Sequence, residues 1–435
     1  MKIQEIPRNR YLTSLIERKQ NTLIKVITGI RRCGKSYLMN RLFYRHLRES
    51  GVDEAHIIRF AFDSAEDLQC IGEDLLTLTR ENRPVSPEKF MTYIAGKIRD
   101  DEVYYLLLDE VQNLGAFETV LNSYLRHENL DIYVTGSNSK FLSNDVLTEF
   151  AGRGDEIHIY PLSFSEYYAT CRTLSPLQAF DTYMRYGGLP FTASLPSEEQ
   201  KTAYLAAQMN NVFLKDIIMR HHILHTADLE ELVNTIASGM SALTNPSRLA
   251  HTFQSVKGSR LSAPTIETYL SYLEDAFLIR RVTRFDIRGM KYINTPYKIY
   301  FEDTGLRNAR LAFRQIERTY LMENIIYNEL RIRGFQVDVG VVFTRETTAD
   351  GNDLKKQLEI DFVANKGNQR YYIQSAWMMP DAMKECQELR PFNLTQDSFK
   401  KILILGTEMK PWRNEKGYVI MGIIDFLLND DSLAW

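Results

Sequence analysis

A glycine-rich segment after a short apolar run limits the folds open to this chain more than any other part of its sequence. Residues 23–28, LIKVIT, are β-like, and the next eight residues lead into a helix-compatible stretch. These eight are Gly29, Ile30, Arg31, Arg32, Cys33, Gly34, Lys35 and Ser36. In the spacing G-x-x-x-x-G-K-S, the glycines let the backbone wrap an anion, and the helix N-terminus points at phosphate oxygens. The segment predicts a nucleotide-binding P-loop, in which Lys35 reaches the β/γ-phosphates and Ser36 holds Mg²⁺.

Further β-like runs follow the P-loop, with enough residues between them for helices. They begin at His56, Val103, Asp131 and Glu156. Such alternation predicts a parallel sheet that is covered by helices on both faces. The run from Val103 ends in Asp109 and Glu110, which therefore lie at the carboxyl edge of the sheet, beside the phosphates. We expect Asp109 to orient Mg²⁺ and Glu110 to polarise the attacking water.

Two more stretches carry candidate nucleotide contacts. The run from Asp131 ends in the residues 135–138, TGSN, which puts small polar side chains next to Asp109. Asn138 is the preferred sensor of the γ-phosphate, with Ser137 as the alternative. Arg153 lies before the fifth β-like run, where an arginine can face the nucleotide of a neighbouring subunit and neutralise transition-state charge. The alternative is a surface arginine at a helix C-terminus.

Composition and cysteine usage set the background for these motifs. With 435 residues, of which 44% are hydrophobic and 25% are charged, the chain can bury a large core and is expected to form two to four domains. The four cysteines have no C-x-x-C spacing, which favours free thiols in a reducing compartment. The charged N-terminus has no apolar signal core, and no long apolar run follows, so we expect a cytoplasmic protein with no membrane contact. The net charge of −3 argues against a general polycation.

The order of these parts resembles that of the AAA+ ATPases. More narrowly, the segments GIRRCGKS, LLLDEVQN, VTGSNSKFLS, AGRGDEIHIYPLSFSEY, YGGLP and IYFEDTGLRNA are similar to those of prokaryotic AAA+ ATPases that carry a C-terminal domain of unknown function. The resemblance covers nearly the whole chain. It implies ATP as the nucleotide, assembly as rings that are usually hexamers, and binding to branched DNA. It also implies an ATPase core at 1–162 and, in the helical stretch 163–220, a small helical lid.

Residues 221–303 predict a winged helix, in which three helices precede a β-like hairpin. The candidate recognition helix is roughly 263–276. The candidate DNA contacts are the basic residues around this helix and the hairpin, namely Lys257, Arg260, Arg280, Arg281, Arg284, Arg288 and Lys291. Such cations bind phosphates without base specificity, and Tyr292 can stack on an unpaired base. The alternative is a module that binds proteins, with cations that only solvate a wing.

Residues 304–435 contain a helix-compatible run followed by two strands, an order that resembles the restriction-endonuclease-like fold. The resemblance puts Asp361 at the metal-binding aspartate, Glu329 or Glu323 at the helix acid, and Gln374 where active members have glutamate. Ala376 takes the place of a lysine. Because glutamine is a poorer ligand for hard cations and no lysine remains to activate water, we expect a vestigial nuclease site at Glu329, Asp361 and Gln374. The domain would then serve in DNA binding or ring packing. The alternative is that Glu359 and Asp361 are strand carboxylates that face solvent.

The sequence thus predicts an α/β protein: a P-loop AAA+ parallel-sheet domain with a helical lid, a winged-helix module and a C-terminal restriction-endonuclease-like domain. The expected function is ATP hydrolysis with Mg²⁺, coupled to the binding or remodelling of DNA, foremost branched DNA, by a homo-oligomer that is expected to be a hexamer. Two alternatives remain open. One is a nucleotide-dependent switch that acts on protein partners, and the other is an ATP-gated DNA nuclease.

Overall fold

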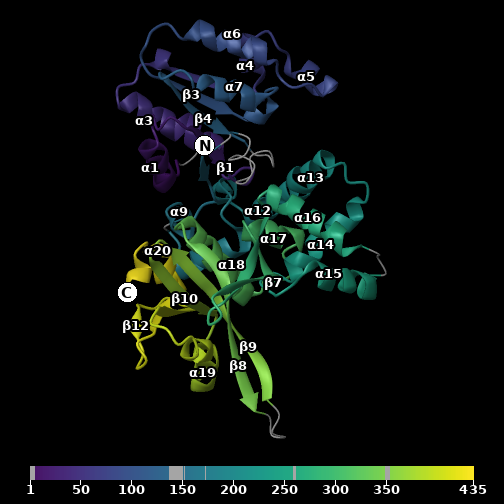
Figure 1. Ribbon diagram of the computed structural model, residues 1–435, viewed down its shortest axis with the longest axis vertical. Helices are drawn as coiled ribbons and strands as arrows, with labels where there is room; N and C mark the ends of the chain where they lie inside the picture. The colour runs from purple at the N-terminus through teal and green to yellow at the C-terminus, as the bar shows by residue number, and fades with distance from the viewer. Residues whose placement is uncertain (1–4, 137–149, 151, 172, 258–260, 348–352) are drawn as a thin grey trace. The chain divides into compact units, whose positions relative to one another are not determined.

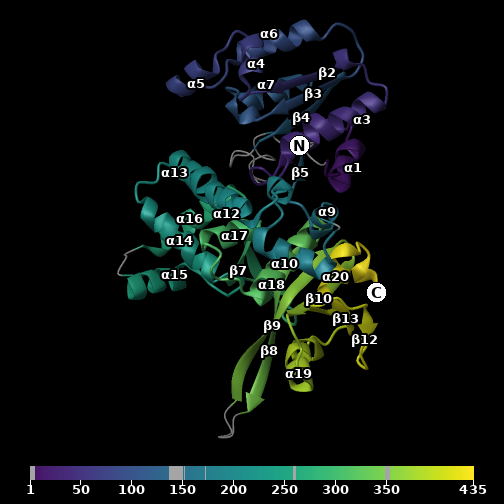
Figure 2. The same ribbon diagram turned by 180° about the vertical axis from the view of Figure 1, so that it is seen from behind.

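The computed structural model describes residues 5–136, 150, 152–171, 173–257, 261–347 and 353–435 (Figure 1; Figure 2). Contacts between residues divide the chain into two bodies, Glu5–Tyr160 and Pro161–Trp435. The expected end of the ATPase core, residue 162, lies two residues beyond this division. Each body has its own sheet and is described separately below.

The first body is built around a five-stranded sheet with the strand order β2-β3-β4-β1-β5. Its strands are β1 (Ile24–Thr28), β2 (Ile57–Ala61), β3 (Tyr104–Asp109), β4 (Leu130–Thr135) and β5 (Gly154–His158). Every pairing between neighbours is parallel, which confirms the prediction from the alternating β-like runs. Helices cover both faces, and β1, β3 and β4 are accordingly buried along their whole length.

Three helices of the first body begin at clear capping signals. The side chains of Ser64, Asp74 and Ser86 accept main-chain N–H bonds at the starts of α4, α5 and α6. The helical elements are α1 (Asn9–Glu17), α2 (Lys35–Tyr37), η1 (Leu38–Phe43), α3 (Tyr44–Glu49), η2 (Glu54–His56), α4 (Ala65–Cys70), α5 (Leu75–Glu81), α6 (Pro87–Lys97), η3 (Val111–Asn113) and α7 (Phe117–Tyr124). A buried core that includes Phe60, Phe90, Leu106 and Leu121 joins α6 and α7 to β2 and β3.

The second body begins with helices. They are α9 (Phe164–Tyr168), α10 (Pro176–Tyr186), α11 (Pro190–Ser194), α12 (Glu198–Ala207), η5 (Gln208–Leu214), α13 (Lys215–Arg220), α14 (Thr226–Ser238), α15 (Pro246–Thr252), η6 (Phe253–Lys257) and α16 (Ala263–Asp275). Later helical elements are α17 (Thr304–Arg310), α18 (Arg318–Ile332), α19 (Ala382–Asn393), α20 (Ile423–Leu428) and η7 (Ser432–Ala434). The two segments YGGLP and EDTGLRNA meet here, because Asp303 accepts the N–H of Gly188 at 2.7 Å and Asn308 donates to the oxygen of Met184 at 2.9 Å.

A mixed, eight-stranded sheet completes the second body, in the order β12-β13-β11-β10-β9-β8-β6-β7. Its strands are β6 (Ile279–Asp286), β7 (Lys291–Phe301), β8 (Gln336–Thr347), β9 (Asp353–Lys366), β10 (Gln369–Ala376), β11 (Lys400–Leu405), β12 (Trp412–Arg413) and β13 (Val419–Gly422). In both views β8 and β9 project as a two-stranded arm beyond the other strands (Figure 1; Figure 2).

The hairpin expected as a wing is part of this sheet. Strand β6 pairs with β7, but its last residues, Arg284 to Asp286, also pair in parallel with Val339 to Val341 of β8. Phe285 and Ile287 are buried in the same core cluster as Val342 and Ile360. The expected division at residue 303 therefore differs from the structure, because it runs through a continuous sheet whose strands share a core.

Candidate functional site

Two glycines shape the P-loop at the carboxyl end of β1. Gly29 has a φ of +135°, and a Cβ atom there would lie 2.1 Å from the main-chain oxygen of Ile159. Gly34 has a φ of +103° and caps the start of α2. Both backbone conformations favour glycine, and at position 29 no other residue fits without displacing the chain beyond β5.

Lys35 lies inside the curve of this loop. Its residue is 5% exposed, and its Nζ donates to the main-chain oxygens of Gly29 at 2.9 Å and Ile30 at 3.2 Å. These carbonyls hold the ammonium group at the loop, beside the N-terminus of α2. The arrangement suits recognition of a phosphate chain, because a positive charge and free helix N–H groups converge on one place.

Asp109 ends β3 and is 6% exposed. Its Oδ1 accepts the hydroxyl of Thr135, its Oδ2 accepts the Nδ2 group of Asn40 at 3.2 Å, and the Ser36 hydroxyl also donates to it. Burial raises the pKa of Asp109, while the bonds from Thr135 and Ser36 oppose that change. A hydroxyl and a carboxylate that already touch are hard oxygen donors of the kind Mg²⁺ takes, so Ser36 and Asp109 fit this ion.

Glu110 follows in the left-handed backbone region, with φ 52° and ψ 47°. Its N–H donates to Thr135 Oγ1 at 3.2 Å, and its Oε2 accepts the Nε2 group of Gln112. A non-glycine residue in this conformation costs free energy and persists where the surroundings demand it, which is common at functional sites. The turn thus separates the two acids, so that Asp109 remains with Ser36 while Glu110 turns toward Gln112.

Sequence reasoning missed Asn40 and Asp63, and it placed Thr135 beside Asp109 without giving it a role. Thr135 joins Asp109 to the main chain of Glu110, and Asn40 binds Asp109 from η1. Asp63, just after β2, is a further acid near them: partial burial and then the carboxylates of Glu110 and Asp109 raise its pKa. A signal was present for Thr135 and Asp63, because both follow a β-like run at the same edge as Asp109. Asn138 and its alternative Ser137 lie outside the described residues.

Arg153 lies at the amino-terminal ends of the strands, whereas the P-loop follows the carboxyl-terminal end of β1. It is exposed, its main-chain oxygen accepts the N–H of Ile24 at 2.9 Å, and the next residue, Gly154, pairs with Ile24. The P-loop begins after Thr28, so the length of β1, roughly 16 Å, separates Arg153 from it. The chain therefore does not bring Arg153 to its own Lys35.

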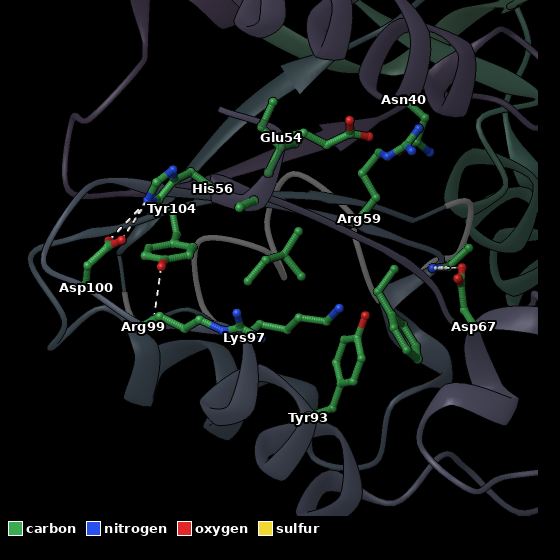
Figure 3. A pocket seen from close by; sticks show the side chains of 15 residues that line it. Asn40, Glu54, His56, Arg59, Asp67, Tyr93, Lys97, Arg99, Asp100 and Tyr104 are labelled. Carbon is green, nitrogen blue, oxygen red and sulfur yellow. Dashed lines mark hydrogen bonds and ion pairs between the residues drawn. The ribbon is translucent and has the colours of Figure 1, made fainter. Parts of the chain in front are cut away.

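A hollow of about 540 Å³ runs along the edge strand β2 (Figure 3). Arg59 of β2 and Lys97 of α6 line it, and His56 pairs with Asp100 at one end. Asn40 is on its rim and also donates to Asp109. The hollow therefore lies next to Asp109, but no residue of the P-loop lines it.

The candidate DNA contacts divide into internal and exposed cations. Arg281 pairs with Glu267 and Glu274, and the buried Arg284 donates to the oxygens of Pro296 at 2.9 Å and Thr295 at 3.2 Å. These two guanidinium groups stabilise the hairpin, which corrects their assignment as phosphate contacts. The remaining described candidates are more open: Arg280 over the Phe277 ring, and the exposed Arg288, Lys291 and Tyr292 near the β6–β7 turn. The Lys257 side chain and Arg260 lie outside the described residues.

The C-terminal acids also differ from expectation. Glu329 pairs with Arg333 at 2.7 Å, whereas Glu323 approaches the same ammonium group as Asp361, that of Lys298. Positions 323 and 329 differ by about 240° around a helix, so only one of them can face the sheet. Glu323, and not Glu329, therefore lies with Asp361 at Lys298, which differs from the expected grouping of Glu329 with Asp361 and Gln374. Gln374 bonds to the N–H of Asp361 at 3.3 Å and to Glu388 at 3.1 Å.

The burial of Lys298 among acids was not predicted, because Lys298 was counted only as one of the cations of the stretch 280–298. Its signal was a lysine inside the apolar run 297–301, YKIYF, since a buried lysine requires acidic partners.

Among the residues that the structure describes, no helix has the length and apolar character needed to cross a membrane.

Comparison with known proteins identifies two matching family models. One, described as an AAA domain, matches residues 21–168, and the other, described as a domain of unknown function (DUF8612), matches residues 177–317. An uncharacterized protein of Haemophilus influenzae is 32% identical over 97% of this chain and 98% of its own length. An uncharacterized protein of Methanocaldococcus jannaschii is 24% identical over 83% of this chain and 76% of its own. A solved structure, a Walker-type ATPase of Pyrococcus abyssi, has a TM-score of 0.45 and 17% identity over 71% of this chain and 96% of that one.

Proposed function

This chain belongs to a family of P-loop ATPases in which an AAA domain is joined to a domain of unknown function, and we propose that it couples ATP hydrolysis to the binding or remodelling of DNA, foremost branched DNA. The observation that carries the proposal of hydrolysis is the contact between Ser36, Asp109 and Thr135 beside the Lys35 loop. Ser36 and Asp109 are the groups that bind Mg²⁺ with a nucleotide, and the neighbouring acid, Glu110, is the group that hydrolysis would require in addition.

Each residue of this edge has a separate proposed task. Lys35 and the loop N–H groups bind the phosphates, and Ser36 and Asp109 would hold Mg²⁺, which supplies charge neutralisation on the phosphate oxygens. Glu110 orients the attacking water once it leaves Gln112. Asn138 would sense the γ-phosphate. Arg153 is proposed to act on the nucleotide of a neighbouring subunit, in a homo-oligomer that we propose to be a hexamer, because it is exposed at the edge away from its own P-loop.

Support for DNA as a partner comes from the β6–β7 turn. Arg288 and Lys291 are exposed there, and the Tyr292 side chain is open beside them. Exposed cations next to an exposed aromatic ring suit a nucleic-acid backbone with an unpaired base. Lys257, Arg260 and Arg280 remain proposed contacts. For the C-terminal sheet we propose the restriction-endonuclease-like fold, retained as a DNA-binding or ring-packing platform, since Gln374 is occupied by Asp361 and Glu388.

The test is ATP turnover with no DNA, with a linear duplex and with a four-way junction of the same length. We expect the junction to raise kcat more than the duplex does, and Lys35→Ala to abolish turnover in all three conditions. Full turnover by Lys35→Ala would contradict the assignment of residues 29–36 as the site that binds ATP for hydrolysis. Turnover that is indifferent to every DNA would remove the coupling and leave an ATPase with another partner.

A second candidate function, a nucleotide-dependent switch on protein partners, is favoured by one observation: Arg281 and Arg284 are internal, which reduces the basic surface. Salt dependence separates the two candidates, because phosphate contacts release counterions. We expect Arg288→Glu/Lys291→Glu to weaken junction binding and to reduce the slope of log K against log salt by about 1.8, for two phosphate contacts. The matched control is Lys97→Glu/Arg99→Glu, the same charge change on exposed cations of the first body. Equal effects of the two pairs would favour the switch.

A further inference from the structure

A buried lysine lies among three carboxylates in the second body. The side chain of Lys298, on β7, is 4% exposed, and its Nζ lies 2.8 Å from Glu323 Oε1, 2.7 Å from Glu359 Oε1 and 3.7 Å from Asp361 Oδ1. Glu323 comes from α18, and the other two acids come from β9. The ammonium group is thus surrounded by carboxylate oxygens from two other elements.

Neutral groups also donate hydrogen bonds to two of these carboxylates. The Tyr300 hydroxyl donates to Glu323 Oε1 at 2.6 Å, and both the N–H and the hydroxyl of Ser375 donate to Asp361 Oδ2 at 2.8 Å. Tyr300 thus binds the same oxygen of Glu323 as Lys298 does, whereas Ser375 binds the oxygen of Asp361 that is not the one nearest to Lys298. Tyr300 and Ser375 therefore help to position the carboxylates independently of Lys298.

The central cation of this cluster, the ammonium group of Lys298, carries less positive charge than the three acids around it could balance. One ammonium group faces three carboxyl groups, so the cluster contains fewer cationic than acidic groups. Several carboxylate oxygens around one centre are the ligand set of hard divalent cations. The Glu359 side chain is 35% exposed, which provides a path for an ion from solvent.

We propose that Lys298 is the resident cation of a divalent-metal site: its ammonium group holds Glu323, Glu359 and Asp361 where a metal ion would otherwise hold them, and the site takes no metal while Lys298 is in place. The C-terminal sheet is then closed to metal-dependent cleavage by an occupied site as well as by Gln374 and Ala376. This inference goes beyond the proposed ATPase function and does not depend on it.

The test uses the full-length chain without nucleotide and MnCl₂ as the probe. Lys298→Met removes the charge and keeps much of the side-chain length. We expect this variant to bind one Mn²⁺ ion per chain more than the wild type in calorimetry, with a Tm that rises with Mn²⁺ concentration as mass action requires. Lys298→Met/Asp361→Asn is the matched control and should lose the additional ion. In the wild-type background, Asp361→Asn should leave the number of bound Mn²⁺ ions unchanged.

Several results would overturn the proposal. A folded Lys298→Met that binds no additional ion shows an ordinary ion-pair cluster. A variant that stays unfolded even with Mn²⁺ shows that a metal does not replace the ammonium group. An ion in the wild type that disappears in Asp361→Asn shows that the site is open. DNA cleavage by the wild type in Mn²⁺ that is lost in Lys298→Met would make Lys298 a nuclease group. ATP turnover enters none of these measurements, so they stand apart from the test of the proposed function.

Discussion

At the scale of single residues, one hydroxyl joins the two acids of the nucleotide edge. Thr135 donates to Asp109 and accepts the N–H of Glu110, so it fixes both the side chain of the first acid and the backbone of the second. It lies at the end of β4, which pairs with β3 up to the neighbouring residue, Val134. A threonine at this position therefore sets the angle at which the two carboxylates leave the sheet.

Thr135→Val removes this hydroxyl at almost constant volume. We expect kcat for ATP hydrolysis to fall about 10- to 100-fold, since hydrogen bonds to charged groups contribute about 1.5–3 kcal/mol and each 1.36 kcal/mol is a factor of ten. Thr192→Val is the matched control, because its buried hydroxyl has no hydrogen-bond partner among the described residues. Steady-state kinetics with both variants decide the matter, and a kcat within twofold of the wild type for Thr135→Val would refute the role.

Glu323 gives the second body a pH dependence of defined sign. Burial raises its pKa to about 7, whereas an unfolded glutamate titrates near about 4.3. Between these values the folded chain keeps a proton that the unfolded chain has released, so the contribution of Glu323 to stability is full below about pH 4.3 and is lost as the pH rises through about 7.

Glu323→Gln should flatten that decline. We expect the difference in free energy of unfolding between the wild type and Glu323→Gln to change steadily from pH 4 to pH 7, measured by urea denaturation at each pH. Glu408→Gln, a change at an exposed position, is the control and should follow the wild type. A constant difference for Glu323→Gln across this interval would contradict the raised pKa.

At the scale of elements, the predictions succeeded where the pattern is local. The strands β1 to β4 each follow from an apolar run, and β5 follows from a β-like run that begins at Glu156, two residues after the start of the strand. The P-loop, Asp109 and Glu110 follow from where two of these runs end. The β6–β7 hairpin shows the limit, because its polar residues Arg284 and Asp286 are buried by partners that lie elsewhere in the chain. The same holds for Lys298, whose partners are 25 to 63 residues away on α18 and β9. Sequence spacing alone does not reveal such pairings.

The shared sheet predicts how fragments of the second body behave. Residues 221–303, the expected winged helix, should not unfold cooperatively when expressed alone, because β6 would lose its pairing with β8 and Phe285 and Ile287 would lose their core. Residues 161–435 should retain a cooperative thermal transition. Circular dichroism melts of both fragments provide the measurement. A sharp transition in the short fragment would show that residues 221–303 fold independently, as a separate winged-helix domain would.

At the scale of the whole molecule, the arrangement of Arg153 concerns assembly. The main chain of Arg153 is at the end of the sheet where β1 begins, and Lys35 follows the end where β1 stops. We therefore propose that Arg153 acts on the nucleotide of another copy of this chain. The unit that hydrolyses ATP would then be a pair of neighbouring subunits, each of which contributes one side of the site.

Mixing two inactive variants tests this shared site. Arg153→Ala keeps the P-loop and Lys35→Ala keeps the arginine, so random mixing in equal amounts should give about one quarter of wild-type turnover, as half of the P-loops meet half of the arginines. A mixture of Lys35→Ala with Glu110→Gln is the control and should stay inactive, because both lesions fall on the P-loop side. Native mass spectrometry confirms that mixed oligomers form. Mixed oligomers without recovered turnover would rule out Arg153 acting between subunits.

The close approach of Gly29 to Ile159 bears on the order in which neighbouring subunits hydrolyse ATP. Strand β5 begins just after Arg153, pairs with β1 along its whole length, and ends just before the residue whose oxygen abuts the first glycine of the P-loop. In an oligomer that uses Arg153 between subunits, one rigid strand would touch the nucleotide of a neighbour at one end and its own nucleotide at the other. If binding of ATP displaces this strand, each site would affect the next, and turnover would then rise sigmoidally with ATP concentration.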